Sequence, residues 1–257
     1  MISFKKIEAA LQKFKKNQPF DHCIVDGFFD FKIAKLLEKD FPRYEDPVWF
    51  EYNNPLEHKK ALNDWNKFPP LTYQAFMMLN SPRMIKLLKK YVGVNLFPDM
   101  GLHGGGWHIH GQGGNLNPHL DYSIHPKNGL QRKLNIIIYL SEHLKPAIHK
   151  GHLGLWSHNS TAKQPHQLIR EIEPIFNRAI IFDTTQHSWH GMSCLLKVPK
   201  GIYRKSLAVY YLTKPNHAEA HKRALYAPRE DQKNNKELLK IIKLRMNVQT
   251  SAWVYKK

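Results

Sequence analysis

The chain has 257 residues, of which 42% are hydrophobic and 23% charged, and its formal net charge at pH 7 is +18. This composition is typical of a globular protein, and no apolar run reaches the roughly 18 residues of a membrane span. Residues 1–20 are amphipathic and lysine-rich rather than a signal peptide, so we expect a cytoplasmic protein without a membrane segment. Its two cysteines, Cys23 and Cys194, are expected to be free thiols in a reducing compartment.

The net positive charge raises the question of an anionic partner such as nucleic acid. Lysines are spread from Lys5 to Lys257 and accompany no recognisable nucleic-acid-binding module, so we expect no specific nucleic-acid partner. Histidines are concentrated instead, with 12 of the 16 between His103 and His190. Because a mononuclear metal site uses only two or three histidines, most of these must serve other purposes.

Residues 1–42 predict two helices and a short strand. Ile7, Leu11 and Phe14 share one face of a first helix whose other faces carry lysines. Residues 23–25 predict a strand that ends at Gly27, and residues 31–41 a helix that ends before Pro42.

The next segment, residues 43–70, is rich in aromatic and charged residues without a clear period, and we interpret it as loops. Its aromatic residues either pack structurally or line a substrate groove. Residues 71–79 predict a helix, and another follows the Ser81-Pro82 cap and ends at Gly93.

The chain changes character at Gly101. Seven of the 14 glycines lie between Gly101 and Gly114, and β-branched and aromatic runs dominate up to about residue 212. The glycines either form a flexible loop at the site or simply permit turns. About eight short strands are predicted, and they indicate a double-sheet jelly roll or related barrel: residues 101–111, 117–123, 133–140, 152–156, 169–172, 179–182, 188–192 and 206–212.

After Pro215 an apolar stripe predicts a return to helix, with the local positive charge on a solvated outer face. We therefore expect a single α+β domain over residues 1–257. It divides into a helical N-terminal part (1–100), a β core (101–213) and a helical C-terminal extension (214–257).

The sequence His119-Leu-Asp121 is the first candidate metal-binding element. Residues two apart on an extended strand point to the same face, which here carries an imidazole and a carboxylate. Two histidines and one carboxylate are a ligand set of non-haem iron. His187 and His190 compete as the third ligand, and we favour His190 because Gly191 permits close backbone approach. His187 and His125 remain candidates for supporting or surface roles.

Six motifs in order resemble the Fe(II)- and 2-oxoglutarate-dependent dioxygenases of the prolyl-hydroxylase-like group, over roughly residues 18–213. They are His119-x-Asp121, Arg132-x-x-Asn135-Ile-Ile-Ile-Tyr139-Leu140, Gly151-x-Leu153-x-Leu155-Trp156, Pro174-x-x-Asn177-Arg178, His187-Ser-x-His190-Gly191 and Arg204-Lys-Ser206. The resemblance implies a double-stranded β-helix with Fe(II) on His119, Asp121 and His190. It also implies that 2-oxoglutarate chelates the iron and pairs its distal carboxylate with Arg204 and Tyr139.

The chemistry of these residues agrees with the resemblance. Arginine offers two parallel donors to one carboxylate, which suits Arg204 to a buried dicarboxylate. Ser206, two residues further on the same strand face, either adds a hydroxyl or bonds only backbone and water. Tyr139 could alternatively be a core aromatic with another partner, while Asn135 and Trp156 are expected to be wall residues.

Other metal chemistries fit less well. Zinc-dependent hydrolysis would favour a His-Glu-x-x-His element, which this chain lacks, and the spacing of His119 and Asp121 differs from the usual cupin ligands. The expected reaction consumes 2-oxoglutarate and O2, releases succinate and CO2, and hydroxylates a substrate. The substrate is expected to be a protein side chain of the prolyl type; alternatives are a small molecule or sugar, or a non-catalytic basic binding module.

Overall fold

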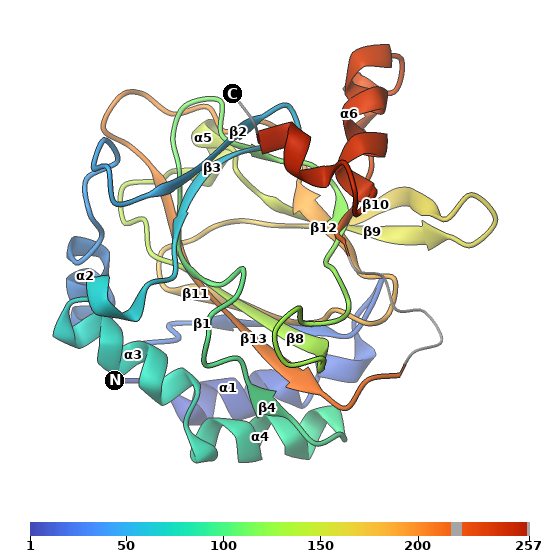
Figure 1. The fold of residues 1–257 in the computed structure, drawn as a ribbon. Coiled ribbons are helices and arrows are strands. Elements are labelled where there is room, and N and C mark those ends of the chain that lie inside the picture. Colours follow the sequence, from blue (N-terminus) through green and yellow to red (C-terminus); the bar gives the residue numbers. More distant parts are fainter. Residues whose placement is uncertain (217–222, 256–257) are drawn as a thin grey trace.

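Two antiparallel β-sheets curl around the centre of the computed structural model, which describes residues 1–216 and 223–255 (Figure 1). The path of the larger sheet is β1-β11-β8-β13-β5-β3-β2, and that of the smaller sheet is β10-β9-β12-β7-β14. This arrangement confirms the predicted α+β class with a double-stranded β-helix core. Because the strands pair across long stretches of sequence, residues from distant motifs meet between the sheets.

The larger sheet contains β1 (His22–Asp26), β2 (Phe50–Asn54), β3 (Glu57–Leu62), β4 (Phe97–Pro98), β5 (Gly106–His110), β6 (Asn115–Leu116), β8 (Gln131–Tyr139), β11 (Arg178–Asp183) and β13 (Arg204–Thr213). The smaller sheet contains β7 (His119–Leu120), β9 (Leu153–Asn159), β10 (Gln164–Ile172), β12 (Trp189–Met192) and β14 (Leu225–Tyr226). Strand β8 is central and mostly buried, as its apolar run predicts.

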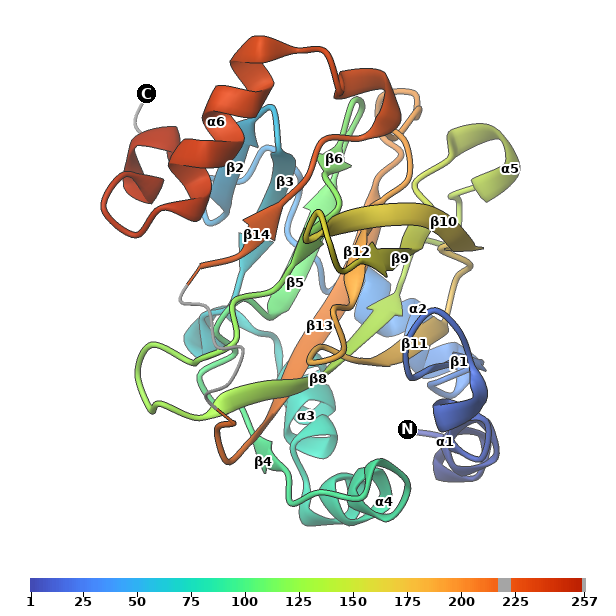
Figure 2. The same ribbon diagram turned by 90° about the vertical axis from the view of Figure 1, so that its right-hand side faces the viewer.

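Helices from the first hundred residues cover the outside of the larger sheet (Figure 2). The α-helices are α1 (Phe4–Leu11), α2 (Phe31–Lys39), α3 (Pro70–Leu79), α4 (Pro82–Val92), α5 (Pro146–His149) and α6 (Lys236–Met246), with short 3-10 turns η1 (Phe14–Lys16), η2 (Trp65–Lys67), η4 (Glu230–Gln232) and η5 (Ser251–Tyr255). Leu37, Phe76 and Leu88 on α2, α3 and α4 join the same buried cluster as Ile136 and Val209 on the sheet. Burial of this apolar surface holds the helices against the sheet.

The predicted start and end of α4 are confirmed. The Ser81 hydroxyl accepts a hydrogen bond from the Met84 amide at 3.3 Å, which satisfies a free donor of the first turn. Gly93 ends the helix in the left-handed region, with φ of 86°.

Two of the predicted segments are only partly correct. Residues 43–70 contain the β2–β3 hairpin and η2 rather than loops alone, because charged side chains on β3 face a cavity and obscure the strand pattern. The C-terminal extension contains the predicted helix, α6, but it also contributes β14, which pairs with β7. The charged face assigned to solvent is also partly buried, since Arg229 is only 7% exposed.

The aromatic residues of the 43–70 segment divide between packing and cavity lining. Trp49 packs tilted on Trp107 in the core, whereas Phe50 and Tyr52 line the cavity.

The two cysteines, Cys23 and Cys194, are free thiols. Cys23 is buried, which raises the pKa of its thiol to about 12. Within the described residues, no helix combines the length and apolar character needed to cross a membrane.

Asn177 joins the N-terminal segment to the β core. It lies in the left-handed region, with φ of 63°, and is 4% exposed. Its side-chain oxygen accepts a hydrogen bond from the Phe29 amide at 2.9 Å, and its amide nitrogen donates to the Phe29 carbonyl at 2.8 Å. Its backbone nitrogen donates to the carbonyl of Tyr139 at 2.8 Å.

Replacing Asn177 with alanine should lower the free energy of unfolding by about 2 to 4 kcal/mol, because two buried backbone groups lose partners and alanine tolerates this conformation poorly. Urea denaturation measures the change. Asn66→Ala, at an exposed position, is the control and should leave stability within about 0.5 kcal/mol. An Asn177→Ala variant as stable as the wild type would contradict this role.

Candidate metal centre

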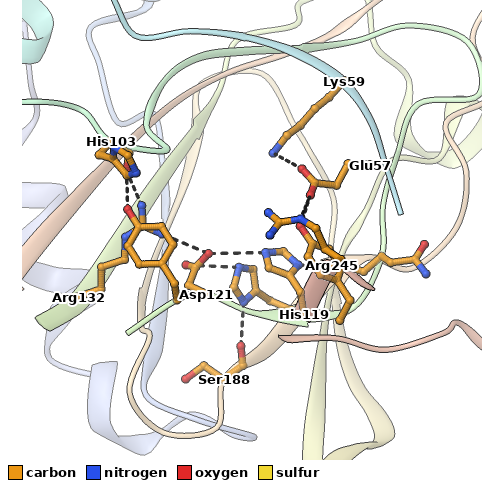
Figure 3. A network of polar contacts seen from close by, with 12 residues as sticks. Glu57, Lys59, His103, His119, Asp121, Arg132, Ser188 and Arg245 are labelled. Carbon is orange, nitrogen blue, oxygen red and sulfur yellow. Dashed lines mark hydrogen bonds and ion pairs between the residues drawn. The ribbon is translucent and has the colours of Figure 1, made fainter. Parts of the chain in front are cut away.

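His119, Asp121 and His190 come together between the sheets. His119 on β7 and His190 on β12 are directly opposite in the antiparallel register, and Asp121 follows the end of β7. Ligand atoms from all three lie within 4.8 Å of one another (Figure 3). The Asp121 carboxylate lies 3.7 Å from His119 Nε2 and 3.9 Å from His190 Nε2. The donor set and its spacing therefore fit one transition-metal ion.

Backbone carbonyls orient both imidazole rings. His119 Nδ1 donates to the Asn117 carbonyl at 2.9 Å, and His190 Nδ1 donates to the Ser188 carbonyl at 2.8 Å. With the proton on Nδ1, each Nε2 presents its lone pair to the group, which is the arrangement a metal ligand requires. Gly191 permits the close approach of the two strands, because a Cβ there would lie 2.6 Å from the Asn117 carbonyl oxygen.

The electrostatics favour the protonation states that a metal needs. Burial would raise the pKa of the Asp121 carboxyl, but the neighbouring His119 and the Arg132 guanidinium outweigh it and lower that pKa. Burial and the neighbouring His119 lower the pKa of His190 to about 4. At neutral pH, Asp121 is therefore ionised and His190 is neutral, as metal ligands must be.

Arg132 is a site residue to which sequence reasoning gave no role. Its guanidinium lies 3.5 Å from Asp121 and is stacked between the Tyr122 and Tyr210 rings, 3.6 Å from each centroid. It also donates to the carbonyl of His103. These contacts hold a cation against the Asp121 carboxylate and restrict the orientation of that carboxylate.

Arg204, Ser206 and Tyr139 occupy neighbouring strands beside the metal group. Ser206 on β13 is opposite Tyr139 on β8 and also opposite His108 on β5. Arg204 is 4% exposed, donates from Nε to the Gly151 carbonyl at 2.8 Å, and lies 4.8 Å from the centroid of the Tyr139 ring. Across the described residues, no carboxylate lies within ion-pair distance of Arg204, so this buried cation suits an external anion.

A cavity of about 860 Å³ connects these groups. His119, Asp121, His190, Arg204 and Ser206 all line it, as does Asn135, whereas Tyr139 and Trp156 do not. A cavity of this size accommodates a small co-substrate together with part of a second ligand.

The other two histidine candidates lie outside the metal group. His187 has a φ of 50°, and its ring stacks on His158 at a centroid distance of 4.0 Å. His125 lies 3.5 Å from the carboxylate of Asp99 and lines the cavity.

The C-terminal segment supplies a wall that sequence reasoning missed. Tyr226 on β14 is opposite His119 in register, and its ring stacks on the His119 ring at 5.3 Å. Its hydroxyl donates to Glu57, whose carboxylate also lies 3.6 Å from Arg245 and 4.0 Å from Lys59. In the sequence, Glu57 and Lys59 are two positions apart. This spacing indicates a shared face only if β3 is recognised as a strand.

His110 is a buried polar side chain of this cavity. It is 2% exposed, and neither ring nitrogen has a hydrogen-bond partner among the described residues. Burial, then Arg204 and Lys59, lower its pKa well below the usual value. A buried polar ring of this kind needs a partner from a bound ligand or water.

Known proteins resemble this chain in sequence and in fold. Residues 105–212 match the 2OG-Fe(II) oxygenase superfamily, and no curated protein matches the chain. A Pseudomonas putida prolyl-4-hydroxylase is 14% identical with a TM-score of 0.57, covering 81% of this chain and 100% of its own. A Trichoplax adhaerens prolyl hydroxylase, in complex with a hypoxia inducible factor peptide fragment, is 16% identical with a TM-score of 0.58, covering 81% and 90%.

HygX from Streptomyces hygroscopicus, with nickel and 2-oxoglutarate bound, is 12% identical with a TM-score of 0.51, covering 80% of this chain and 86% of its own. At these identities the structural likeness establishes the shared fold.

In the metal-free protein, His110 should make stability depend on pH. Above pH 6.5 the ring is neutral in both states; below it the unfolded ring binds a proton that the folded ring does not, so the free energy of unfolding falls. Between pH 6.5 and 5, His110→Gln should flatten this fall by up to roughly 1.4 kcal/mol per pH unit. Denaturation at several pH values measures the slopes. His143→Gln, at an exposed position, should keep the wild-type slope; equal slopes for all three proteins would refute the assignment.

Proposed function

Because residues 105–212 match the 2OG-Fe(II) oxygenase superfamily, we propose that the chain is an Fe(II)- and 2-oxoglutarate-dependent dioxygenase that hydroxylates a protein side chain of the prolyl type. The observation that carries the proposal is the convergence of two histidines and a carboxylate beside a buried arginine that has no carboxylate partner among the described residues. A binding module without catalysis need not retain this combination.

His119, Asp121 and His190 hold the metal in this proposal. Three protein ligands leave further coordination positions for a co-substrate and oxygen. When bound, Fe(II) with 2-oxoglutarate and O2 supplies the oxidising chemistry, and succinate and CO2 are the co-products. The protein contributes orientation: the Asn117 and Ser188 carbonyls fix the imidazole rings, and Arg132 fixes the carboxylate.

Arg204 binds the distal carboxylate of 2-oxoglutarate, supported by Ser206 and Tyr139. Arg204 is buried, which lowers its pKa, yet the group remains a cation that requires an anionic partner. The Tyr139 hydroxyl stays protonated, because burial raises its pKa although Arg204 opposes the rise. It can therefore donate a hydrogen bond to a carboxylate.

A protein substrate is supported by the open cavity and by the fold shared with prolyl hydroxylases, one of which is described with a bound peptide fragment. Succinate formation from 2-oxoglutarate, measured with and without proline-containing peptides, tests the proposal. Stimulation by peptides supports it. If only sugars or other small molecules stimulate succinate formation, the substrate is a small molecule rather than a protein. If no substrate gives succinate, the proposed dioxygenase activity is wrong.

His190→Ala should abolish Fe(II) binding and succinate formation, because the site loses one of three ligands. Equilibrium metal binding by calorimetry and succinate assays measure both effects. His187→Ala is the matched control and should retain metal binding, since its ring stacks on His158 instead. The reverse pattern, with loss only in the His187 variant, would reassign the third ligand.

Arg204→Ala should weaken 2-oxoglutarate binding by about 2 to 5 kcal/mol, because the buried carboxylate loses its charged partner. Arg43→Ala, which removes an exposed arginine, should leave the 2-oxoglutarate requirement unchanged. If the Arg204 variant requires no more 2-oxoglutarate than the wild type, Arg204 does not bind the distal carboxylate.

A further inference from the structure

A network of buried polar side chains joins Asn115 and Asn117 to Arg229 of the C-terminal extension. Arg229 Nη1 donates to the Asn115 side-chain oxygen at 2.5 Å and to the Asn117 side-chain oxygen at 2.9 Å. Asn117 is fully buried, and Asn115 and Arg229 are 4% and 7% exposed. Because buried polar groups are costly unless they are hydrogen-bonded, these three side chains need one another in this arrangement.

The hydrogen bonds of the network leave each asparagine amide one orientation. The Asn117 amide nitrogen donates to the Ala227 carbonyl at 3.1 Å and to the Gln232 side-chain oxygen at 2.7 Å, so its oxygen faces the guanidinium. The Asn115 amide nitrogen donates to the Pro55 carbonyl at 3.1 Å and to the Asn117 side-chain oxygen at 2.9 Å. Every donor of the two amides meets an acceptor, so the network holds the Asn117 side chain in one position.

Asn117 is also the residue that orients the metal ligand His119. Its carbonyl accepts a hydrogen bond from His119 Nδ1 at 2.9 Å, and its backbone nitrogen donates to the Leu56 carbonyl at 2.8 Å. Pro118 separates the two residues and has a fixed φ, which restricts the backbone between them. With its side chain and backbone nitrogen both held, Asn117 presents its carbonyl to the His119 ring in a fixed direction.

The segment that carries Arg229 contacts the metal centre through its backbone as well. β14 is the edge strand of the smaller sheet, and its Tyr226 is opposite His119 in register (Figure 2). The Ala227 nitrogen donates to the Pro118 carbonyl at 2.8 Å. We call residues 225–232 the clasp; they lie outside residues 105–212, which carry the match to the superfamily.

Anchoring of the clasp does not require a buried cation. The ion pair of Arg229 with Asp231 is of a kind that contributes little, because Asp231 is 68% exposed. Apolar side chains of similar size commonly replace a buried ionic group without loss of stability. The buried donors of Arg229 are therefore better explained by a role in positioning Asn117. An apolar cluster already holds this part of the chain and consists of Leu56, Ala224, Tyr226, Leu238 and Ile242.

We propose that Arg229 is a positioning residue of the metal centre, which holds His119 in its ligand orientation through Asn117, so that docking of the clasp and binding of the metal strengthen each other. The inference rests on the proposed function, in which His119 is a metal ligand. Because such coupling is reciprocal, a metal ion bound at His119 also stabilises the docked clasp.

Calorimetric titration of the metal-free protein with Mn(II), without oxygen or 2-oxoglutarate, measures the coupling independently of turnover. Arg229→Met removes the donors and should weaken Mn(II) binding by about tenfold to hundredfold, as is typical when an outer hydrogen-bond partner of a metal site is lost. Arg229→Lys should restore part of the affinity, because a single nitrogen makes both bonds to the asparagines. Lys233→Met, which removes a cation of the same segment whose side chain is 58% exposed, should bind Mn(II) as the wild type does.

A second control separates positioning from a general loss of stability. Asn177→Ala should lower the free energy of unfolding by removing hydrogen bonds to Phe29, outside the clasp and the metal centre. It should nevertheless bind Mn(II) with the wild-type affinity. If Arg229→Met and Asn177→Ala weaken Mn(II) binding equally, the effect of Arg229 is one of general stability and the inference is overturned.

Hydrogen exchange of the wild type, read by mass spectrometry, tests the coupling without any variant. Saturating Mn(II) should slow exchange in the peptide that contains the Ala227 amide by at least about tenfold, the reciprocal of the effect on metal affinity. The peptide that contains the Gly93 amide, bonded to the Lys89 carbonyl at the end of α4, should exchange at an unchanged rate.

Three results decide between the inference and the proposed function. If the wild type binds no Mn(II), the proposed metal centre is wrong and the inference fails with it. If the wild type binds Mn(II) but Arg229→Met binds it equally well, the inference alone is overturned. Exchange at Ala227 that is the same with and without Mn(II) would also overturn the inference, whether or not the protein forms succinate.

Discussion

The pairing of β7 with β12 is the constraint on which the site depends. It places His119 opposite His190, and Asp121 follows at the end of the same strand. Gly191 is required for this approach, since any side chain there would meet the Asn117 carbonyl. The carbonyls of Asn117 and Ser188 then orient the two rings. Backbone geometry therefore fixes the donor set before any metal binds, which reduces the ordering cost of binding.

Charged side chains surround the metal group. Arg132 lies against the Asp121 carboxylate, and Arg204 lies beside Tyr139 and Ser206. The ion pair between Glu57 and Arg245 lies on the remaining side of the metal group. Arg132 packs between the Tyr122 and Tyr210 rings, and Arg204 donates to the Gly151 carbonyl, so these two cations have fixed positions in the cavity. The wide distribution of surface charge and the local charge of the cavity are thus separate features of one basic chain.

The sequence allowed prediction wherever a local signal was strong. The apolar run of β8 and the Ser81-Pro82 cap gave correct elements because burial and capping act over a few neighbouring residues. The spacing of His119 and Asp121 predicted a shared direction, and both side chains reach the metal group although β7 ends at Leu120. Which of His187 and His190 faces them could not be derived from spacing, because it depends on pairing across the sheet.

The missed elements have a common cause. Strand β3 carries Glu57 and Lys59 toward a polar cavity, so its pattern lacks the usual apolar alternation. Strand β14 has two residues and pairs with β7, more than a hundred positions earlier. Such pairings arise from tertiary contacts and leave little trace in local sequence. The part of the cavity wall formed by β3 and β14 could therefore not be predicted from the sequence.

The central claim is that one metal ion joins the three ligands to 2-oxoglutarate, and thermodynamic coupling tests it most directly. Calorimetric titration of 2-oxoglutarate, without oxygen, should show much tighter binding to the Fe(II)-loaded protein than to the metal-free protein, and Asp121→Ala should remove this difference. Equal 2-oxoglutarate affinity with and without Fe(II) in the wild type would contradict the account.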